Sequence, residues 1–208
     1  VVVWAKYVFF VLLKGKAVDM FWESILAASR VTEDPIKAWE EHNANLAKHC
    51  AHLNSLNIRS LHYTAANGTD FTVGMIPEGR WCGGGDTSLQ GIYFNPNIPT
   101  EECFISPKRG LAEGIVYSTM PLSYRGQLID KFWLRFEGGK AVEVGAEVGE
   151  EQLKDMISMD EGAAYLGECA LVPQASPICE SGILYYNTLF DENASCHLAL
   201  GSGYADTI

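Results

Sequence analysis

Three short segments, far apart in the chain, place acidic or imidazole side chains beside residues that interrupt regular structure. The segments are residues 97–102, 166–168 and 191–197. Carboxylate oxygens and imidazole nitrogens bind divalent metal ions, and donors from separate segments can converge on one ion. The sequence contains neither a His-Glu-x-x-His nor a Cys-x-x-Cys pattern. It therefore predicts a carboxylate-rich metal site, with Glu102, Glu168, Glu192 and His197 as its candidate ligands.

The residues around two of these ligands favour a rigid and crowded site. Pro96 and Pro99 restrict the backbone before Glu102, so this carboxylate can be held in place without a helix. Gly167 has no side chain and leaves room beside Glu168. Two divalent ions about 3.5–4 Å apart, bridged by carboxylates, can activate a water molecule and polarise a carbonyl group. The predicted site is therefore suited to hydrolysis.

The third segment carries the other two ligands. Glu192 and His197 are too far apart to share one face of a regular helix. We expect a helix to begin at Asp191 or shortly after, with Glu192 at its entrance and His197 pointing inward from its first turns. An isolated glutamate usually faces solvent, and a lone histidine on an apolar face more often belongs to the core. The four residues therefore indicate a metal site only as a set.

Composition and charge exclude several classes of partner. The chain has 208 residues, of which 48% are hydrophobic, enough for one large domain or two small ones. Its formal net charge of -11 repels phosphate backbones and anionic lipids, so we expect neither nucleic acid nor a membrane as a partner. The six cysteines form no paired motif, which favours a reducing cytoplasm. Cys103 and Cys169 lie next to proposed ligands, and strand alternation predicts that they fill space behind the site.

The ends of the sequence suggest a piece of a longer protein. The first 13 residues are apolar but short, are interrupted by Lys6 and lack a signal-peptide cleavage site, so they predict neither a transmembrane helix nor an export signal. The sequence has no initiator methionine and stops abruptly at Ile208. We therefore expect further residues on either side.

The pattern of apolar residues predicts helices first and strands afterwards. Residues 16–30 have helical spacing, and a second helix begins after Asp34 as N-cap with Pro35 in its first turn. Its expected buried stripe is Trp39, Leu46, Cys50 and Leu53. The three histidines of this region are expected to be solvated or at the edge of the core; they are His42, His49 and His52.

From residue 58 the sequence changes to short strands separated by Gly, Asn and Pro, at 61–64, 71–75, 91–94 and 115–119. A hairpin pairs 128–137 with 141–147 across two glycines, so that its aromatic residues and two valines, Val142 and Val144, meet on one face. Helices are expected at 149–159 and 160–166. We predict an α+β fold: a helical lead-in at 1–56, then a mixed, mainly antiparallel, barrel-like sheet with flanking helices. The second part, 57–208, would be the metal-binding catalytic domain.

Several longer strings resemble a known family. They are NIPTEECF at 97–104, PLSYRG at 121–126, DEGA at 160–163, LGECALVP at 166–173, SPI at 176–178 and NTLFDENASCHLALG at 187–201. Together they are similar to the aminopeptidase T and aminopeptidase S family of metallopeptidases, and weaker matches extend upstream. The two longest strings are too specific to arise from composition.

The resemblance implies a two-metal exopeptidase, dependent on zinc or cobalt, that removes N-terminal residues from peptides by means of metal-activated water. It implies that Glu102, Glu168, Glu192 and His197 are metal ligands, with Glu168 as the bridge, and that Tyr204 contacts the metal or the tetrahedral intermediate. It also implies a homodimer, for which exposed aromatics such as Trp81 or Trp133 would be suitable unless they belong to the core.

This sequence departs from the family in two ways. Family members are longer, with an α/β domain before this chain and a His-x-Asp segment near their C-terminus that completes the metal cluster. We therefore expect the 208 residues alone to bind metal incompletely and to show little activity.

Two other functions remain open. A non-catalytic binding or assembly module would keep the fold and use Glu102 and Glu168 only as hydrogen-bond acceptors. A glycosidase would need two acids and no metal, and His197 and Tyr204 do not support it. Loss of activity with a chelator would separate these alternatives from a metallopeptidase.

Overall fold

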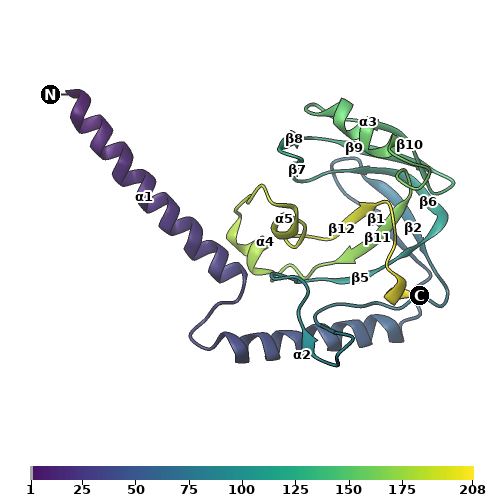
Figure 1. The fold of residues 1–208 in the computed structure, drawn as a ribbon. Coiled ribbons are helices and arrows are strands. Elements are labelled where there is room, and N and C mark those ends of the chain that lie inside the picture. Colours follow the sequence, from purple (N-terminus) through teal and green to yellow (C-terminus); the bar gives the residue numbers. More distant parts are fainter. Residues whose placement is uncertain (1) are drawn as a thin grey trace.

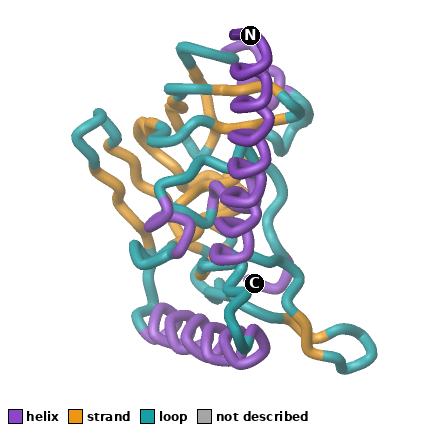
Figure 2. The backbone as a smooth tube through the Cα atoms, turned by 90° about the vertical axis from the view of Figure 1, so that its left-hand side faces the viewer, coloured by secondary structure: helices purple, strands orange, loops and turns teal. Residues whose placement is uncertain are grey.

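The computed structural model describes residues 2–208, with side chains from residue 15 onward. Two long helices come first, α1 (Val2–Ala28) and α2 (Pro35–Ser55), and three short ones follow, α3 (Glu150–Ser158), α4 (Pro177–Ser181) and α5 (Thr188–Glu192). In both views α2 runs beneath the strands, and Figure 1 shows α1 extending away from them (Figures 1 and 2). No helix in the described part of the chain combines the length and apolar character needed to cross a membrane.

The strands form two principal antiparallel sheets. The larger has the order β1-β2-β6-β9-β10, and the smaller has the order β12-β11-β5. The strands of the larger sheet are β1 (Ser60–Thr64), β2 (Asp70–Met75), β6 (Pro107–Tyr117), β9 (Trp133–Glu137) and β10 (Lys140–Gly145). Those of the smaller sheet are β5 (Cys103–Ile105), β11 (Leu166–Leu171) and β12 (His197–Leu200). Two small hairpins pair β3 (Asp86–Thr87) with β4 (Tyr93–Phe94) and β7 (Leu122–Tyr124) with β8 (Gln127–Ile129).

This architecture agrees with the predicted fold class in its main features. Helices precede a strand-rich body, and both principal sheets are antiparallel. Among the described residues, β1 and β10 are the edges of the larger sheet and do not pair with each other, so no closed barrel is found. The chain ends in a single turn of 3-10 helix at Ala205–Thr207. The division into a lead-in and a catalytic domain remains a prediction.

The main core lies between the two sheets and α2. Phe71 of β2 and Phe136 of β9 meet with ring centroids 5.2 Å apart. Ile105 and Cys169 from the smaller sheet, and Leu46 from α2, belong to the same cluster. The smaller sheet is therefore fixed from behind by packing against the larger one, which leaves its other side available for polar groups.

The beginning of α2 follows the predicted rule. Asp34 accepts a hydrogen bond from the backbone N–H of Lys37 at 3.1 Å, and Pro35 occupies the first turn. The predicted stripe is also confirmed, since Leu46 and Cys50 are buried and Trp39 and Leu53 are partly buried. His42 is buried as well, deeper than the sequence suggested.

Removing this cap gives the first testable prediction. We expect Asp34→Ala to lower the free energy of unfolding by about 1 kcal/mol, because one N–H of the first turn loses its acceptor. Thermal or urea unfolding would measure this. Glu33→Ala is the matched control, since Glu33 is an exposed neighbour without a capping contact, and an equal loss in both variants would contradict the capping role.

The predicted hairpin is present, but one of its residues points differently. Val144 lies opposite Leu134 as expected, whereas the register shifts between Ala141 and Glu143. This bulge places Val142 outside the ladder, and its side chain is exposed. The prediction that both valines meet the aromatic face is therefore wrong for Val142.

Two predicted helices are also wrong. Residues 160–164 form turns and β11 begins at Leu166, because Asp160 accepts hydrogen bonds from the backbone N–H groups of Gly162 and Ala163 and so stabilises a compact turn. The last helix does not begin at Asp191. Its N-cap is Asn187 and it ends at Glu192, since the Asp191 carboxylate accepts from N–H groups that precede the helix.

The two tryptophans suggested for a dimer surface are not freely exposed. Trp81 is 3% exposed and belongs to the main core. Trp133 is partly buried, with its ring 6.3 Å from that of Tyr117. These side chains therefore serve packing within the chain.

Candidate metal centre

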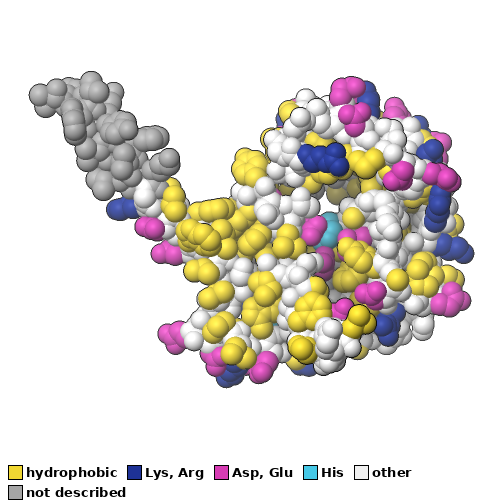
Figure 3. All heavy atoms as spheres, viewed as in Figure 1, with side chains coloured by type: hydrophobic (Ala, Val, Ile, Leu, Met, Phe, Trp, Pro, Cys, Tyr) yellow, Lys and Arg dark blue, Asp and Glu magenta, His cyan; other side chains and the backbone are white. Residues whose placement is uncertain are grey.

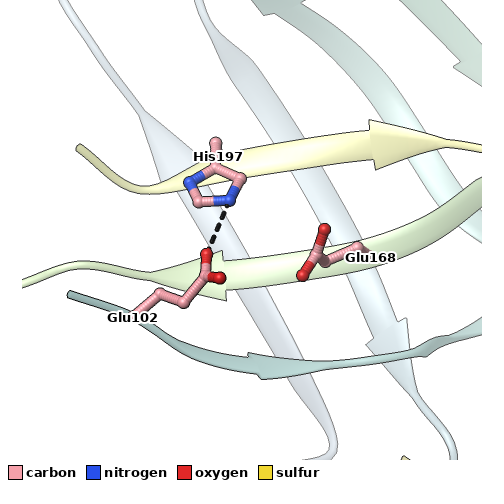
Figure 4. A group of neighbouring side chains, drawn as sticks. All are labelled: Glu102, Glu168 and His197. Carbon is pink, nitrogen blue, oxygen red and sulfur yellow. Dashed lines mark ion pairs between the residues drawn. The ribbon is translucent and has the colours of Figure 1, made fainter. Parts of the chain in front are cut away.

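The three strands of the smaller sheet bring together residues that are far apart in sequence. Glu102 directly precedes β5, Glu168 lies on β11, and His197 is the first residue of β12. The strand β11 is central and pairs on both sides: Ala170 lies opposite Phe104 of β5 and opposite His197 of β12. Figure 4 shows the three side chains directed toward one another from these elements.

The donor atoms of this triad are close enough to share one ion. Glu102, Glu168 and His197 each offer one ligand atom, and these atoms lie within 4.8 Å of one another. Two ligands of a tetrahedral zinc ion lie about 3.3 Å apart, given bond lengths of about 2.0–2.1 Å. The space-filling view shows a histidine and acidic side chains inside a hollow of the surface (Figure 3). The triad therefore has the spacing and the access that a metal ion needs.

The orientation of His197 also fits a metal. Its Nδ1 lies 3.0 Å from the carbonyl oxygen of Ser195. A carbonyl can only accept, so Nδ1 carries a hydrogen, and Nε2 can offer a lone pair to a metal once it releases its own proton. That Nε2 is 2.9 Å from Oε2 of Glu102, and both buried atoms lack a properly oriented hydrogen-bond partner. A cation satisfies both atoms, either the proton that His197 holds toward Glu102 in the metal-free chain or a metal ion in its place.

The electrostatics of the site point the same way. Burial raises the pKa of Glu168, and the charge of Glu102 raises it further. Burial lowers the pKa of His197, but its contact with Glu102 outweighs this, and the net pKa is raised. Carboxylates crowded at a place of low dielectric repel each other and favour positive charge. A divalent ion would relieve this repulsion.

Glu192 lies at the edge of this group. It is the last residue of α5, and its charge acts on both Glu168 and His197. Burial raises the pKa of its carboxyl group. None of its oxygens belongs to the group of atoms within 4.8 Å. The predicted arrangement, with Glu192 at the entrance of a helix and His197 in its first turns, is wrong: α5 ends at Glu192 and His197 begins a strand.

Tyr204 also lies beside the site. Its backbone N–H donates to Oγ of Ser106 at 2.8 Å, and its ring centroid is 5.0 Å from that of Phe104. Burial raises the pKa of the phenol, and the charge of Glu168 adds to the shift. The phenol therefore stays protonated at neutral pH and can donate a hydrogen bond.

The two cysteines next to the ligands have the predicted role. Cys103 is 3% exposed and Cys169 is fully buried, while their neighbours Glu102 and Glu168 face the site. Cys169 contacts the hydroxyl of Tyr63 at 3.2 Å, on the core side of the sheet. Strand alternation thus separates sulfur atoms from the metal donors.

Gly167 is needed for a reason that the sequence did not reveal. The register of β11 and β12 shifts between Leu166 and Glu168, which makes a bulge at Gly167. A Cβ atom there would come within 2.2 Å of the carbonyl oxygen of Ser202. The glycine thus permits a close approach of two backbones directly before Glu168.

We expect Gly167→Ala to lower the free energy of unfolding by about 1–3 kcal/mol, because the segment at Ser202 must move. Gly162→Ala is the control, since its Cβ would come no closer than 3.3 Å to Oδ1 of Asp160 and would meet no backbone atom. Unfolding of both variants would test this expectation. It would be contradicted if Gly167→Ala were no less stable than Gly162→Ala.

A separate pocket of about 450 Å³ lies near the site. Gly167 and Gly203 line it, and they precede Glu168 and Tyr204 in sequence, but none of the candidate ligands does. The metal chemistry is therefore assigned to the hollow at the triad and not to this pocket.

Sequence reasoning missed a second polar cluster directly beside the triad. Glu101 is 2% exposed and is bound by Arg30, and its backbone N–H donates to Oδ1 of Asn193 at 2.7 Å. Asn193 is fully buried and follows Glu192. The two consecutive glutamates after a proline-rich stretch could have indicated this cluster. Only one of them can point into the metal site, so the other must have a partner on the opposite side.

Comparisons with known proteins agree with the geometry. Residues 2–208 match the family described as thermophilic metalloprotease (M29). The chain belongs to this family. It is 48% identical over 206 residues to aminopeptidase T of Thermus aquaticus and to aminopeptidase AmpS of Bacillus subtilis, covering 99% of this chain and 50% of each relative. The chain thus spans about half the length of the curated M29 relatives that it matches.

A solved structure supports the M29 fold as well. Wild-type AmpT from Thermus thermophilus superposes with a TM-score of 0.85 and 44% sequence identity, over 92% of this chain and 47% of that one. The predicted resemblance to the aminopeptidase T and S family is therefore confirmed, as is a mixed fold with antiparallel sheets. Membership of a metalloprotease family supports the use of a divalent metal.

Proposed function

We propose that this protein is a metal-dependent aminopeptidase that releases N-terminal residues from peptides. The observation that carries the proposal is the convergence of Glu102, Glu168 and His197, with the buried Nε2 of His197 2.9 Å from Oε2 of Glu102. The M29 membership and the names of the relatives support the same reaction class. As a cytoplasmic homodimer it would act on peptides, and its acidic charge opposes nucleic acid and membranes as partners.

The ligands are proposed to be Glu102, Glu168, Glu192 and His197, holding two divalent ions, zinc or cobalt. Glu168 lies on the central strand β11 between the segments that carry the other donors, which suits it to bridge two ions. Glu192 would complete the set from the end of α5. When bound, such ions would supply polarisation of a carbonyl group and activation of a water molecule.

Side chains of the protein itself would orient the site, donate a hydrogen bond and exclude water. His197 keeps its hydrogen on Nδ1 through the carbonyl of Ser195, so its orientation is fixed before substrate arrives. Tyr204 holds its phenolic hydrogen and is proposed to donate it to the oxygen on which negative charge develops. The burial of Glu102 and Glu168 excludes bulk water from the carboxylate side of the site.

The proposal is tested with the full-length protein and an unblocked dipeptide. We expect release of the N-terminal amino acid, its loss after treatment with a chelator, and its return with added zinc or cobalt. The same dipeptide with an acetylated N-terminus is the matched control and should remain intact. Undiminished release after complete metal removal would contradict a metallopeptidase, and no release under any condition would favour a non-catalytic module.

Metal stoichiometry gives a further prediction. The described residues gather only three donors within 4.8 Å of one another, fewer than two ions require. We therefore expect the 208-residue chain alone to bind fewer than two zinc ions tightly per molecule and to show little activity. Two tightly bound ions per chain, measured by elemental analysis after dialysis, would show that this expectation is wrong.

A further inference from the structure

The buried cluster beside the triad joins segments that carry two candidate ligands. Glu101 directly precedes Glu102, and Asn193 directly follows Glu192. The hydrogen bond from the Glu101 N–H to the Asn193 side chain, 2.7 Å long, links the two segments. Any shift of this bond moves both ligand-bearing backbones, since each ligand is the immediate neighbour of a bonded residue.

Asn193 is itself held on every side. Its Nδ2 donates to the carbonyl oxygen of Leu189 at 2.8 Å, which ties it to α5. Its own carbonyl oxygen accepts from Oγ of the fully buried Ser176 at 2.7 Å. Each of these three polar groups of Asn193 has a partner, and its side chain has no room to turn.

The carboxylate of Glu101 is also fixed in place, by groups that do not belong to the triad. Arg30 donates from Nε to Oε1 at 2.9 Å and from Nη2 to Oε2 at 2.6 Å. His42 contacts the carbonyl oxygen of Thr100 at 2.7 Å and lies 3.6 Å from Oε1 of Glu101. A two-pronged arginine contact fixes both the place and the plane of a carboxylate.

The two consecutive glutamates have different partners. Glu101 faces Arg30 and His42, whereas Glu102 faces His197. Because the two side chains belong to adjacent residues, anchoring the first one limits the movement of the second. We propose that Glu101 and Asn193 are positioning residues that fix Glu102 and Glu192 in the geometry for binding metal. This inference rests on the proposed function, since it takes both glutamates as ligands.

The test measures the affinity for zinc alone in the full-length protein, by competition with a chromogenic chelator. The variants are Glu101→Gln, which loses the charge facing Arg30, and Asn193→Ala, which loses the acceptor for the Glu101 N–H. We expect each to raise the Kd for zinc by about 10–100-fold, as is typical when groups that orient metal ligands are removed. Arg30→Lys, a milder variant that keeps the charge, should raise it by a smaller factor.

Asn54→Ala is the matched control for a merely structural effect. Asn54 likewise joins distant backbone, accepting from the Trp81 N–H at 2.8 Å and donating to the Trp81 carbonyl oxygen at 3.0 Å, and it is not next to a ligand. Melting temperatures of all variants show the loss of stability separately. We expect Asn54→Ala to leave the Kd for zinc within about threefold of the wild type.

The outcomes separate the two proposals. If the wild type binds zinc and Glu101→Gln and Asn193→Ala bind it equally tightly, the positioning role is overturned and the proposed function stands. The positioning role also fails if Asn54→Ala weakens zinc binding as much as they do. A wild type that binds neither zinc nor cobalt overturns the proposed function, and the positioning role with it.

Discussion

Replacing Glu168 with glutamine in the full-length protein is expected to lower kcat/KM for an unblocked dipeptide by at least about 100-fold. Glutamine has nearly the same shape, but its neutral amide could not serve as the proposed charged bridge between two cations. Glu168 belongs to the triad and lies on the central strand β11, so no neighbouring residue can replace it. The measurement is steady-state kinetics with zinc or cobalt present.

The same variant should not lose stability. Burial, and then the charge of Glu102, raises the pKa of Glu168 to about 7 in the metal-free chain. A raised pKa means that ionisation of Glu168 destabilises the folded state at pH 7, and glutamine does not ionise. We expect metal-free Glu168→Gln to melt at or above the wild-type temperature at pH 7. Below about pH 4 the carboxyl binds its proton in both states and the difference should disappear.

Glu143→Gln is the control for this prediction, because Glu143 is exposed on β10 and, among the side chains that the structure describes, pairs only with Arg135. It should leave kcat/KM unchanged within about twofold. Full activity of Glu168→Gln would refute the bridging role. A large loss of stability in that variant would instead show that its carboxylate serves folding.

Replacing Arg30 with alanine is expected to destabilise the chain by about 3–5 kcal/mol, measured by urea unfolding. Glu101 is 2% exposed and would keep its buried charge without the two hydrogen bonds that Arg30 supplies. His42 can also carry a positive charge near this carboxylate, since its Nε2 is 3.6 Å from Oε1 of Glu101. The effect is therefore one of an unpaired buried charge.

The loss in Arg30→Ala should depend on pH. Burial lowers the pKa of His42, and Arg30 is among the charges that keep it low. Without Arg30, His42 can bind a proton more readily and partly neutralise Glu101. We expect a smaller loss of stability at pH 6 than at pH 8.

A double variant shows whether the pair itself is responsible. Arg30→Met combined with Glu101→Leu removes both charges, and apolar replacements of this kind are often nearly neutral. We expect it to recover most of the stability that Arg30→Ala loses. If the double variant were as unstable as the single one, packing and not the unpaired charge would explain the loss.

Local signals predicted much of the helical region and of the core. The Asp34 cap, the stripe on α2 and the burial of Cys103 and Cys169 depend on short-range rules of helix capping and strand alternation. These rules hold wherever the element type is right. They also predicted that Glu102 and Glu168 point away from the core, because the cysteines next to them face it.

Long-range contacts account for the parts that sequence reasoning missed. The acid at Asp191 resembled an N-cap, but it binds N–H groups of residues before the helix. Glu101 and Asn193 resembled ordinary neighbours of candidate ligands in the sequence. The partners of Glu101 are distant along the chain: Arg30 lies 71 residues away and Asn193 lies 92 residues away. The position of Arg30 also depends on a positive φ of 54°, which side-chain type does not indicate.

The four candidate ligands could be listed from sequence, but their arrangement could not. The sheet β12-β11-β5 sets it through pairing between strands that are far apart in the chain. The same pairing places Glu102, Glu168 and His197 within 4.8 Å and leaves Glu192 and Tyr204 at the rim. Register between distant strands, and not residue type, decides which donors meet.

The central claim is that these side chains hold a metal ion, and anomalous diffraction tests it most directly. Crystals of the full-length protein grown with zinc would be measured on both sides of the zinc absorption edge. We predict an anomalous peak at about 2.0–2.2 Å from carboxylate oxygens of Glu102 and Glu168 and from Nε2 of His197. Zinc peaks only at other places, with these three side chains free of metal, would contradict the account.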